Sequence, residues 1–283
     1  MTRQITAQTR IAGVVGAPVR HSLSPLIHNA WIQAAGLDAV YLAFAPDREG
    51  LKRLVDGFRG GVVLGLNVTV PFKEEALAVA DRATDEARAS GAANLLLFHA
   101  DGTVEAGSTD GEGLLLALGG AGFDPVGARV ALIGAGGAAR GAVAALLAAG
   151  AARIDVVNRT LERAQAVAAQ HPHVFAHGWG EAAAVLEGAH AVINATTLGM
   201  EGQPSLELPL DAASKTAVVM DMVYRPLKTD LLREAARRGH PVADGLSMLI
   251  GQAVPSFEAM FVRPPPPEVD VRTLCEQALS TSR

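Results

Sequence analysis

Hydrophobic runs alternate with amphipathic stretches along the first part of the chain. Short apolar runs predict strands at 11–15 (IAGVV), 40–45 (VYLAFA) and 61–70. Apolar residues with helical spacing predict helices at 25–35 and 49–58. Strands that alternate with helices in this way indicate an α/β domain with a parallel or mostly parallel sheet.

The same alternation restarts after a connection. The stretch 119–127 (GGAGFDPVG) is rich in glycine and proline, which predicts a loop. It is followed by ARVALIGAGGAARGAVAALLAAGAARIDVVNRT, which has the pattern of strand, glycine turn, helix and second strand. Further strands are predicted at 190–194 (HAVIN) and 217–224 (AVVMDMVY). This second series predicts an inserted nucleotide-binding domain.

The chain is expected to return to its first domain near Asp244–Gly245. The helical pattern GLSMLIGQAVPSFEAMF follows, and a last helix is predicted near 271–280. A length of 283 residues exceeds the usual single core, which also favours two domains. We therefore predict a discontinuous first domain, 1–113 with 246–283, around a second domain of 114–245.

The glycine turn of the second domain has the form G-x-G-x-x-A. It lies just after the strand-like VALI and opens a long helix, as a dinucleotide fingerprint requires. Glycines let the backbone approach a pyrophosphate, whose charge then rests on free N–H groups and on the helix dipole. The alternative is an ordinary tight turn in which small residues serve packing. The predicted cofactor contacts in this turn are Gly134, Ala135, Gly136, Gly137 and Ala138.

The end of the next predicted strand indicates which dinucleotide is bound. An NAD site usually has Asp or Glu there, to accept hydrogen bonds from the ribose hydroxyls. This chain has Asn158-Arg159-Thr160, with Arg163 one helical turn further on. Guanidinium groups bind a 2′-phosphate with paired, charge-assisted hydrogen bonds, so we predict NADP(H). The alternative is that Thr160 is only a helix N-cap and that the arginines are solvated.

The stretch NVTVPFK, residues 67–73, places polar residues at alternate positions. In an extended chain Asn67, Thr69 and Lys73 would share one face, and Pro71 would mark the end of strand pairing. This pattern predicts a strand end that presents polar groups and an amine. The alternative is that Lys73 is a solvated residue at the start of a helix, KEEALAVAD.

Two further stretches combine polar residues with helix starts. In HSLSPLIHNAW, Ser22 and Ser24 precede a proline, so Ser24 is either an N-cap or a binding residue. In STDGEG, Thr109 and Glu112 form a capping box. Asp110 in the same stretch either complements the helix dipole or pairs with a lysine, because a nearby carboxylate stabilises an ammonium group.

The composition excludes several classes of protein. The chain has 49% apolar and 19% charged residues and a net charge of −5. It therefore has no basic stripe of the kind that a nucleic-acid binder needs. The longest run of small apolar residues is too short to span a bilayer, and the start, MTRQITAQTR, has no apolar signal region. One cysteine, Cys275, cannot form an internal disulfide. The histidines lack the spacing of a metal site. These features predict a cytoplasmic protein that binds neither nucleic acid nor membrane and holds no metal.

These motifs occur together, and in the same order, in the shikimate dehydrogenase family. The chain resembles that family over nearly its whole length, through GAPVRHSLSPLIHNA, NVTVPFK, GAANLL, STDGEG, IGAGGAARG, VNRT, INATTLGM, DMVYRPLKT and GLSMLIGQAVPSFEAM. The resemblance implies a three-layer α/β substrate domain and a Rossmann NADP-binding domain with a cleft between them. It also implies the reversible reduction of 3-dehydroshikimate to shikimate with NADPH, in aromatic amino-acid biosynthesis.

The resemblance further implies roles for individual residues. Lys73 and Asp110 match the proposed catalytic pair, in which the amine assists proton transfer while hydride reaches the ring ketone. Residues that match substrate contacts are Ser22, Ser24, Asn67, Thr69, Asn94, Tyr224 and Gln252. Residues that match the surroundings of the ribose and nicotinamide are Asn194, Thr196, Met222, Gly245 and Met248, although the methionines also suit core packing.

Two departures from the family pattern leave the substrate open. Leu95 follows Asn94 where the family commonly has threonine, and Ser108 stands where it commonly has asparagine. Each change removes or shortens a hydrogen-bonding group beside an expected substrate contact. One alternative is therefore a paralogue that acts on quinate or another shikimate-like polyol. A second is a non-catalytic, NADP-binding redox sensor. The sequence is compatible with a monomer or a homodimer.

Overall fold

The chain forms two compact units in a computed structural model that describes residues 5–47 and 49–281. The first unit runs to Thr109 and includes Gln252–Ala278. The second is Asp110–Gly251 with the last residues of the C-terminal helix. The first unit is therefore discontinuous, and helix α10 (Gly245–Phe261) contributes to both units. The predicted first domain also contained residues 1–4 and 282–283, which lie outside the described residues.

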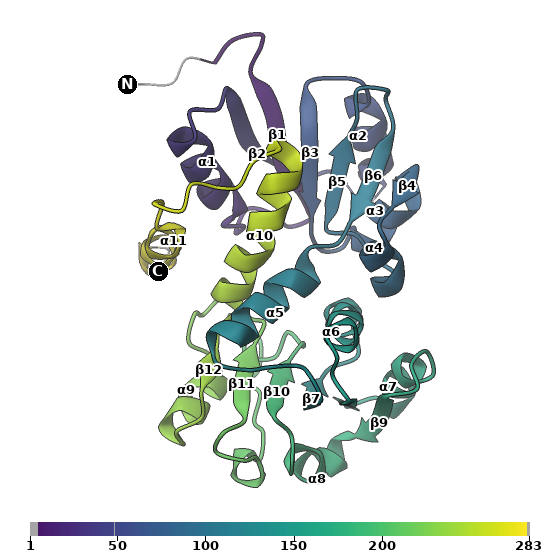
Figure 1. The fold of residues 1–283 in the computed structure, drawn as a ribbon, viewed down its shortest axis with the longest axis vertical. Helices are drawn as coiled ribbons and strands as arrows, with labels where there is room; N and C mark the ends of the chain where they lie inside the picture. The colour runs from purple at the N-terminus through teal and green to yellow at the C-terminus, as the bar shows by residue number, and fades with distance from the viewer. Residues whose placement is uncertain (1–4, 48, 282–283) are drawn as a thin grey trace. The chain divides into compact units, whose positions relative to one another are not determined.

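The first unit has a mixed sheet with the strand order β2-β1-β3-β5-β6-β4 (Figure 1). Strands β1, β2 and β3 are parallel, whereas β5 runs antiparallel to both β3 and β6. The elements of this unit are β1 (Arg10–Val15), α1 (Ser24–Ala34), β2 (Ala39–Phe44), α2 (Gly50–Phe58), β3 (Val63–Val68), α3 (Lys73–Val79), β4 (Arg82–Ala83), α4 (Asp85–Ser90), β5 (Leu95–Phe98), β6 (Val104–Gly107) and α11 (Val271–Thr281).

Helices cover both faces of this sheet. On one face, α2, α3 and α4 pack through Leu51, Val55, Ala76 and Ala87 against Leu66, Val68 and Leu96 of the strands. On the other face, the ring of His28 in α1 stacks on Tyr41 of β2, and Asn67 of β3 donates to Ser256 of α10. Because side chains alternate along a strand, Asn67 faces α10 while Leu66 and Val68 face α2–α4. The predicted three-layer arrangement is confirmed.

Two local predictions in this unit are wrong. The predicted strand 61–70 is too long, because β3 ends at Val68. The Phe72 N–H donates to the Thr69 carbonyl at 3.0 Å, so the chain turns there and Lys73 becomes the first residue of α3. The alternation that linked Asn67 to Lys73 on one strand face therefore does not hold.

Ser24 is also not a side-chain N-cap. The cap position of α1 belongs to Leu23, and no side chain caps the helix there. Instead, the Ser24 N–H donates to the Ser22 hydroxyl at 3.2 Å. The Ser24 hydroxyl instead forms a side-chain hydrogen bond with Tyr41, and Ser24 is only 5% exposed.

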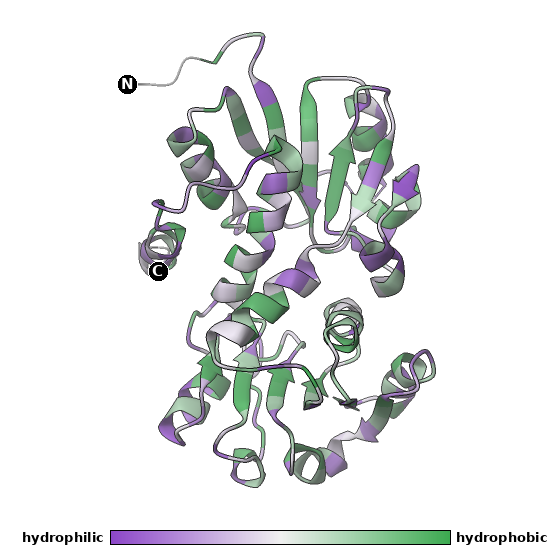
Figure 2. Cartoon of the chain, in the orientation of Figure 1, coloured by the Kyte–Doolittle hydropathy of each residue, from purple (hydrophilic) through white to green (hydrophobic). Residues whose placement is uncertain are grey.

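The second unit has a parallel sheet with the order β12-β11-β10-β7-β8-β9. Its core is apolar on both faces, and its strands are coloured mostly as hydrophobic in Figure 2. The elements are α5 (Asp110–Gly120), β7 (Arg129–Ile133), α6 (Gly137–Ala148), β8 (Arg153–Asn158), α7 (Leu161–Ala168), β9 (Val174–Gly178), η1 (Trp179–Glu181), α8 (Ala182–Leu186), β10 (Ala191–Asn194), η2 (Leu210–Ala212), β11 (Val218–Asp221), α9 (Asp230–Arg237) and β12 (Val242–Ala243).

The strand order of the second unit indicates where a ligand would bind. From β7 the chain proceeds outward to β8 and β9, and it then crosses back to β10 on the other side of β7. Ligands of open α/β sheets bind at such a switch point, beyond the carboxyl ends of the strands. The loops after β7 and β10 lie there. Within the described residues, no helix combines the length and the apolar character needed to cross a membrane.

Candidate functional site

The glycine turn after β7 is shaped by close contact with the loop after β10. Gly134 has φ +110°, and a Cβ there would lie 2.8 Å from Cγ2 of Thr196. Gly134 is therefore required by the fold itself. At Gly136, which has a negative φ, a Cβ would meet no atom of the described residues within 4 Å. Its lack of a side chain instead leaves open space in front of the α6 N-terminus, where backbone N–H groups suit a phosphate.

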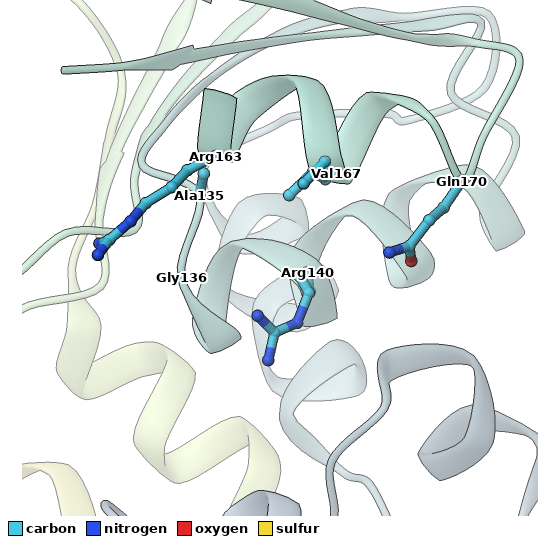
Figure 3. Close-up of a pocket in the computed structure, with 7 residues that line it drawn as sticks. Ala135, Gly136, Arg140, Arg163, Val167 and Gln170 are labelled. Carbon is cyan, nitrogen blue, oxygen red and sulfur yellow. The ribbon is translucent and has the colours of Figure 1, made fainter. Parts of the chain in front are cut away.

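A hollow of about 310 Å³ lies beside this turn, between α6 and α7. Arg163 extends from α7 past Ala135 of the turn, while Arg140 projects from α6 and Gln170 follows the far end of α7 (Figure 3). Ala135 and Arg163, two of the predicted cofactor residues, thus line the same hollow. Arg140 and Gln170 were not predicted. An arginine in the first turn of the helix that follows a glycine turn was a usable signal for Arg140.

The stretch after β8 presents its basic residues to solvent. Arg159 and Arg163 are both exposed. The Asn158 Nδ2 group donates to the Thr160 carbonyl at 2.8 Å, which shapes the turn between β8 and α7. Thr160 occupies the N-cap position of α7, but its side chain makes no capping hydrogen bond. The capping alternative therefore does not account for the threonine hydroxyl.

The loop after β10 is held by Asn194, which is 0% exposed. Its Nδ2 group donates to the Leu198 carbonyl (3.1 Å) and to Asp221 (2.9 Å), and its Oδ1 atom accepts from Thr196 N–H (3.0 Å) and Oγ1 (2.7 Å). A side-chain amide has two N–H protons and two lone pairs on its oxygen, and all four are used here. Asn194 therefore shapes the loop, and its buried side chain is not presented to a ligand.

Three more predicted cofactor residues lie around the end of β11. A Cβ at Gly245 would lie 2.4 Å from the Met222 carbonyl oxygen, so glycine permits the close approach of α10 to this loop. Met222 and Met248 are both partly buried against the core of the unit. They therefore serve packing at least in part. Tyr224, a predicted substrate residue, follows on the same loop and is partly buried.

In the first unit, Asn67 is held at both ends of its side-chain amide. Its Nδ2 group donates to the Asn94 carbonyl at 3.2 Å and to the Ser256 hydroxyl at 2.9 Å. The Tyr41 hydroxyl donates to its Oδ1 atom at 2.8 Å. Asn67 is 5% exposed and Ser256 is 0% exposed. Sequence reasoning found Asn67 but missed Tyr41 and Ser256, because neither belongs to a polar motif.

The same network includes Asn94 and Gln252. The Asn94 Nδ2 group donates to the Thr109 hydroxyl at 2.9 Å and to Oε1 of Gln252 at 3.3 Å. The Thr109 N–H donates to Oδ1 of Asn94 at 2.8 Å, and the hydroxyls of Thr109 and Ser256 are 3.1 Å apart. Asn67, Asn94 and Gln252, which are distant in sequence, are thus joined in one buried polar network.

Tyr41 extends this network to the serines. Burial raises the pKa of Tyr41 well above its ordinary value, and a side-chain hydrogen bond with Ser24 opposes part of that rise. Its ring stacks on the His28 imidazole, with centroids 4.2 Å apart and an interplanar angle of 4°. Burial lowers the pKa of His28 to about 3, so this ring stays neutral at physiological pH. A neutral ring and a protonated phenol allow close stacking without a buried charge.

The remaining predicted residues lie at the edges of the elements. Thr69 follows β3, Ser22 precedes α1, and Lys73 begins α3, all partly buried in the first unit. The Lys73 carbonyl accepts from the Ala93 N–H at 2.8 Å, which joins the start of α3 to the residue before Asn94. Asp110 begins α5 in the second unit.

Family models of known proteins match a part of each unit. Residues 14–96 match a family model described as the shikimate dehydrogenase substrate binding domain, and residues 121–200 match one described as shikimate / quinate 5-dehydrogenase. The chain is 54% identical to the shikimate dehydrogenase (NADP(+)) of Caulobacter vibrioides, over 99% of each chain. The chain belongs to the shikimate dehydrogenase family.

Solved structures of the family share the fold. The crystal structure of shikimate dehydrogenase from Aquifex aeolicus matches with a TM-score of 0.88 and 36% identity, over 96% of this chain and 99% of that one. That of shikimate 5-dehydrogenase from Thermus thermophilus, in complex with NADP(H) and shikimate, matches with a TM-score of 0.85 and 34% identity, over 95% and 99%. The predicted family and fold class are confirmed.

Proposed function

We propose that this member of the shikimate dehydrogenase family reversibly reduces 3-dehydroshikimate to shikimate with NADPH, in aromatic amino-acid biosynthesis. The proposal is carried by the buried network in which Asn67, Asn94 and Gln252 converge. All three match substrate contacts of the family, and Asn67 and Asn94 match groups around the ring hydroxyls. It is supported by 54% identity to a shikimate dehydrogenase (NADP(+)) over the whole chain.

Initial rates of NADP⁺ reduction, with shikimate and quinate compared side by side, test this function. We expect fast turnover of shikimate and slow turnover of quinate. A preference for quinate would instead assign the chain to the paralogue class. Failure to turn over either compound, with NADP⁺ still bound, would favour a non-catalytic NADP-binding protein.

Quinate or a related polyol remains the second candidate because of Leu95. Leu95 pairs with Asn67 across β3 and β5, so the two side chains lie beside each other on one face of the sheet. Leu95 is 4% exposed and adds no hydrogen-bonding group where the family commonly has threonine. The direct comparison of shikimate and quinate turnover decides whether leucine at position 95 is compatible with shikimate as the substrate.

The catalytic assignment rests on Lys73 and Asp110. Bound NADPH supplies the hydride. Negative charge then develops on the ring oxygen, and the Lys73 ammonium group donates a proton to it or stabilises the charge. Asp110, the first residue of α5, is proposed as the second member of the catalytic pair. Ser22 and Ser24 of the first unit are proposed to bind the carboxylate, and Tyr224 of the second unit is proposed as a further substrate residue. Since a hydroxyl has one proton, Ser24 can donate to a carboxylate only by turning that proton away from Tyr41.

The nucleotide contacts are proposed for the second unit. The open space at Gly136 fits a pyrophosphate, which the N–H groups of the α6 N-terminus would hold. The exposed Arg159 and Arg163 fit a 2′-phosphate, and the chain has no carboxylate among Asn158-Arg159-Thr160 to repel it. Thr196 and Gly245 are proposed to lie beside the ribose and nicotinamide. These features favour NADP(H) over NAD(H).

Replacement of Arg159 tests the cofactor assignment. We expect Arg159→Ala to raise the KM for NADP⁺ by roughly 10- to 100-fold, because charge-assisted hydrogen bonds contribute about 1.5–3 kcal/mol. The KM for NAD⁺, which lacks the 2′-phosphate, should change little. Arg237→Ala is the matched control, since Arg237 is an exposed helical arginine of the same unit that pairs with Glu234. Equal effects on both cofactors would remove the phosphate-binding role.

The state of the protein in the cell is also a proposal. We expect a cytoplasmic monomer or homodimer that has a small-molecule substrate. Burial raises the pKa of Cys275, the single cysteine, to about 11, so the thiol is unreactive and suits a reducing compartment. Light scattering of the purified protein would distinguish the two oligomeric states.

A further inference from the structure

We infer that Tyr41 and Ser256 are positioning residues, which together hold the Asn67 amide in one orientation for the substrate. This inference rests on the proposed function. The contacts involved all lie within the first unit. Both residues are almost fully buried, at 1% and 0% exposure.

The partners of Asn67 leave no freedom in the orientation of its amide. A main-chain carbonyl can only accept, so the side-chain atom that faces the Asn94 carbonyl is the amino group, Nδ2. Ser256 accepts the second Nδ2 proton, at 2.9 Å. Tyr41 donates to the Oδ1 atom at the other end, at 2.8 Å. A rotation of the amide by 180° would place Oδ1 against the Asn94 carbonyl, where neither oxygen can donate, and Ser256 could donate to Oδ1 only by giving up its hydrogen bond to the Gln252 carbonyl.

The protons of Ser256 and Thr109 can be assigned in the same way. Ser256 has one hydroxyl proton, which it donates to the Gln252 carbonyl at 2.9 Å. Ser256, at 3.1 Å, is the nearest of three acceptors around the Thr109 hydroxyl, the others being Asn94 Oδ1 at 3.3 Å and Gln252 Oε1 at 3.4 Å, so we assign the Thr109 proton to Ser256. The Thr109 hydroxyl in turn accepts from Asn94 Nδ2. Ser256 is thus the common partner of Asn67, Thr109 and the Gln252 backbone.

This arrangement limits what Asn67 can offer a substrate. Both of its amide protons are used within the protein, and one lone pair of Oδ1 is taken by Tyr41. Asn67 therefore contacts a ligand as an acceptor, through the remaining lone pair. The matching group on the ligand is a hydroxyl that donates its proton. Tyr41 and Ser256 set this polarity without contacting the substrate themselves.

The test is a double-mutant cycle of Tyr41→Phe and Ser256→Ala, with the KM for shikimate, the KM for NADP⁺ and kcat measured for each variant. We expect each single change to raise the KM for shikimate roughly 3- to 10-fold, which is the effect of about one lost hydrogen bond. The KM for NADP⁺ should stay within about twofold. Because both residues act through one amide, the double variant should raise the KM by less than the product of the single effects.

Thr9→Val is the matched control. Thr9 is 6% exposed, and its hydroxyl donates to Asp38 at 2.8 Å at the start of β1. Asn67 pairs with Val14, so the two sites are roughly 16 Å apart along the strands. Thr9→Val should lower the thermal stability but leave the KM for shikimate unchanged.

Three results would overturn the inference. One is an unchanged KM for shikimate in both single variants of an enzyme that turns over shikimate. Another is a double variant whose KM for shikimate rises by the full product of the two single effects. The third is a rise in the KM for shikimate in Thr9→Val as large as in Tyr41→Phe or Ser256→Ala. If Ser256→Ala does not fold, Tyr41→Phe decides alone, because it keeps the ring that stacks on His28. If the wild-type enzyme turns over neither shikimate nor quinate, the proposed function fails first, and this inference fails with it.

Discussion

Lys73→Ala is expected to lower kcat by about 10²- to 10⁴-fold, the range typical of a lost general acid. Binding of NADP⁺ should be unchanged, because the glycine turn and Arg159 belong to the second compact unit, whereas Lys73 begins α3 of the first. Alanine is the best helix former, so α3 should persist. Steady-state kinetics and NADP⁺ titration of the same preparation measure the two effects.

Lys52→Ala is the control for this prediction. Lys52 lies in α2 of the same unit and forms an exposed ion pair with Asp56 at 2.6 Å. Its removal should leave kcat within about twofold, since exposed ion pairs contribute little. Added primary amines should restore part of the activity of Lys73→Ala but have no effect on Lys52→Ala. A kcat for Lys73→Ala equal to that of the wild type would contradict the assignment of Lys73 as a catalytic residue.

Asp155→Asn is expected to have the largest effect on stability, about 2–3 kcal/mol. Asp155 is 0% exposed on β8 and accepts from Arg129 (2.8 Å), Arg153 (2.8 Å) and His177 (2.7 Å). An amide would lose the charge and present N–H groups to these donors. The cost stays at the low end for a broken buried pair, because the Arg129 and Arg153 side chains are 30% and 41% exposed and regain water.

Hydrogen exchange shows whether the loss of stability in Asp155→Asn is confined to the second unit. Peptides from β7 and β8 should lose protection in Asp155→Asn, while peptides from β1–β3 should not. Glu234→Gln is the control in the same unit, since Glu234 is 37% exposed and exposed ion pairs contribute little to stability. Equal loss of protection in both variants would contradict a special role for the buried carboxylate.

The stabilisation by Asp155 also depends on pH. Burial alone would raise its pKa, but hydrogen bonds from Arg153, Arg129 and His177 outweigh that effect, and the net shift is downward from 3.8. The unfolded state therefore takes up a proton at a higher pH than the folded state. The difference between the wild type and Asp155→Asn should be constant above about pH 5 and should shrink below about pH 4, as the folded carboxyl becomes protonated. Unfolding measured across this range checks the sign.

Local patterns predicted the second unit well. The glycine turn directly follows β7, and Asn158-Arg159-Thr160 begins with the last residue of the next strand, β8. Such motifs lie within one βαβ unit, so their arrangement depends on contacts that are close in sequence. Asn194 was the exception in this unit. Its motif was recognised from the sequence. Only the structure shows that its amide protons are donated to Asp221 and Leu198, so that they are not available to a ligand.

In the first unit, the sequence by itself determined the identity of the polar groups: Asn67 was found from the alternating pattern of NVTVPFK, and Asn94 and Gln252 from the resemblance to the family. It did not determine their partners. Ser256 lies 189 positions after Asn67 and meets it only because α10 packs on the face of the sheet opposite to α2–α4. Tyr41 faces Asn67 from another strand, 26 positions away. A buried hydroxyl in an apolar stretch gives no local signal, since its donor and acceptor are brought to it only by the packing of distant elements.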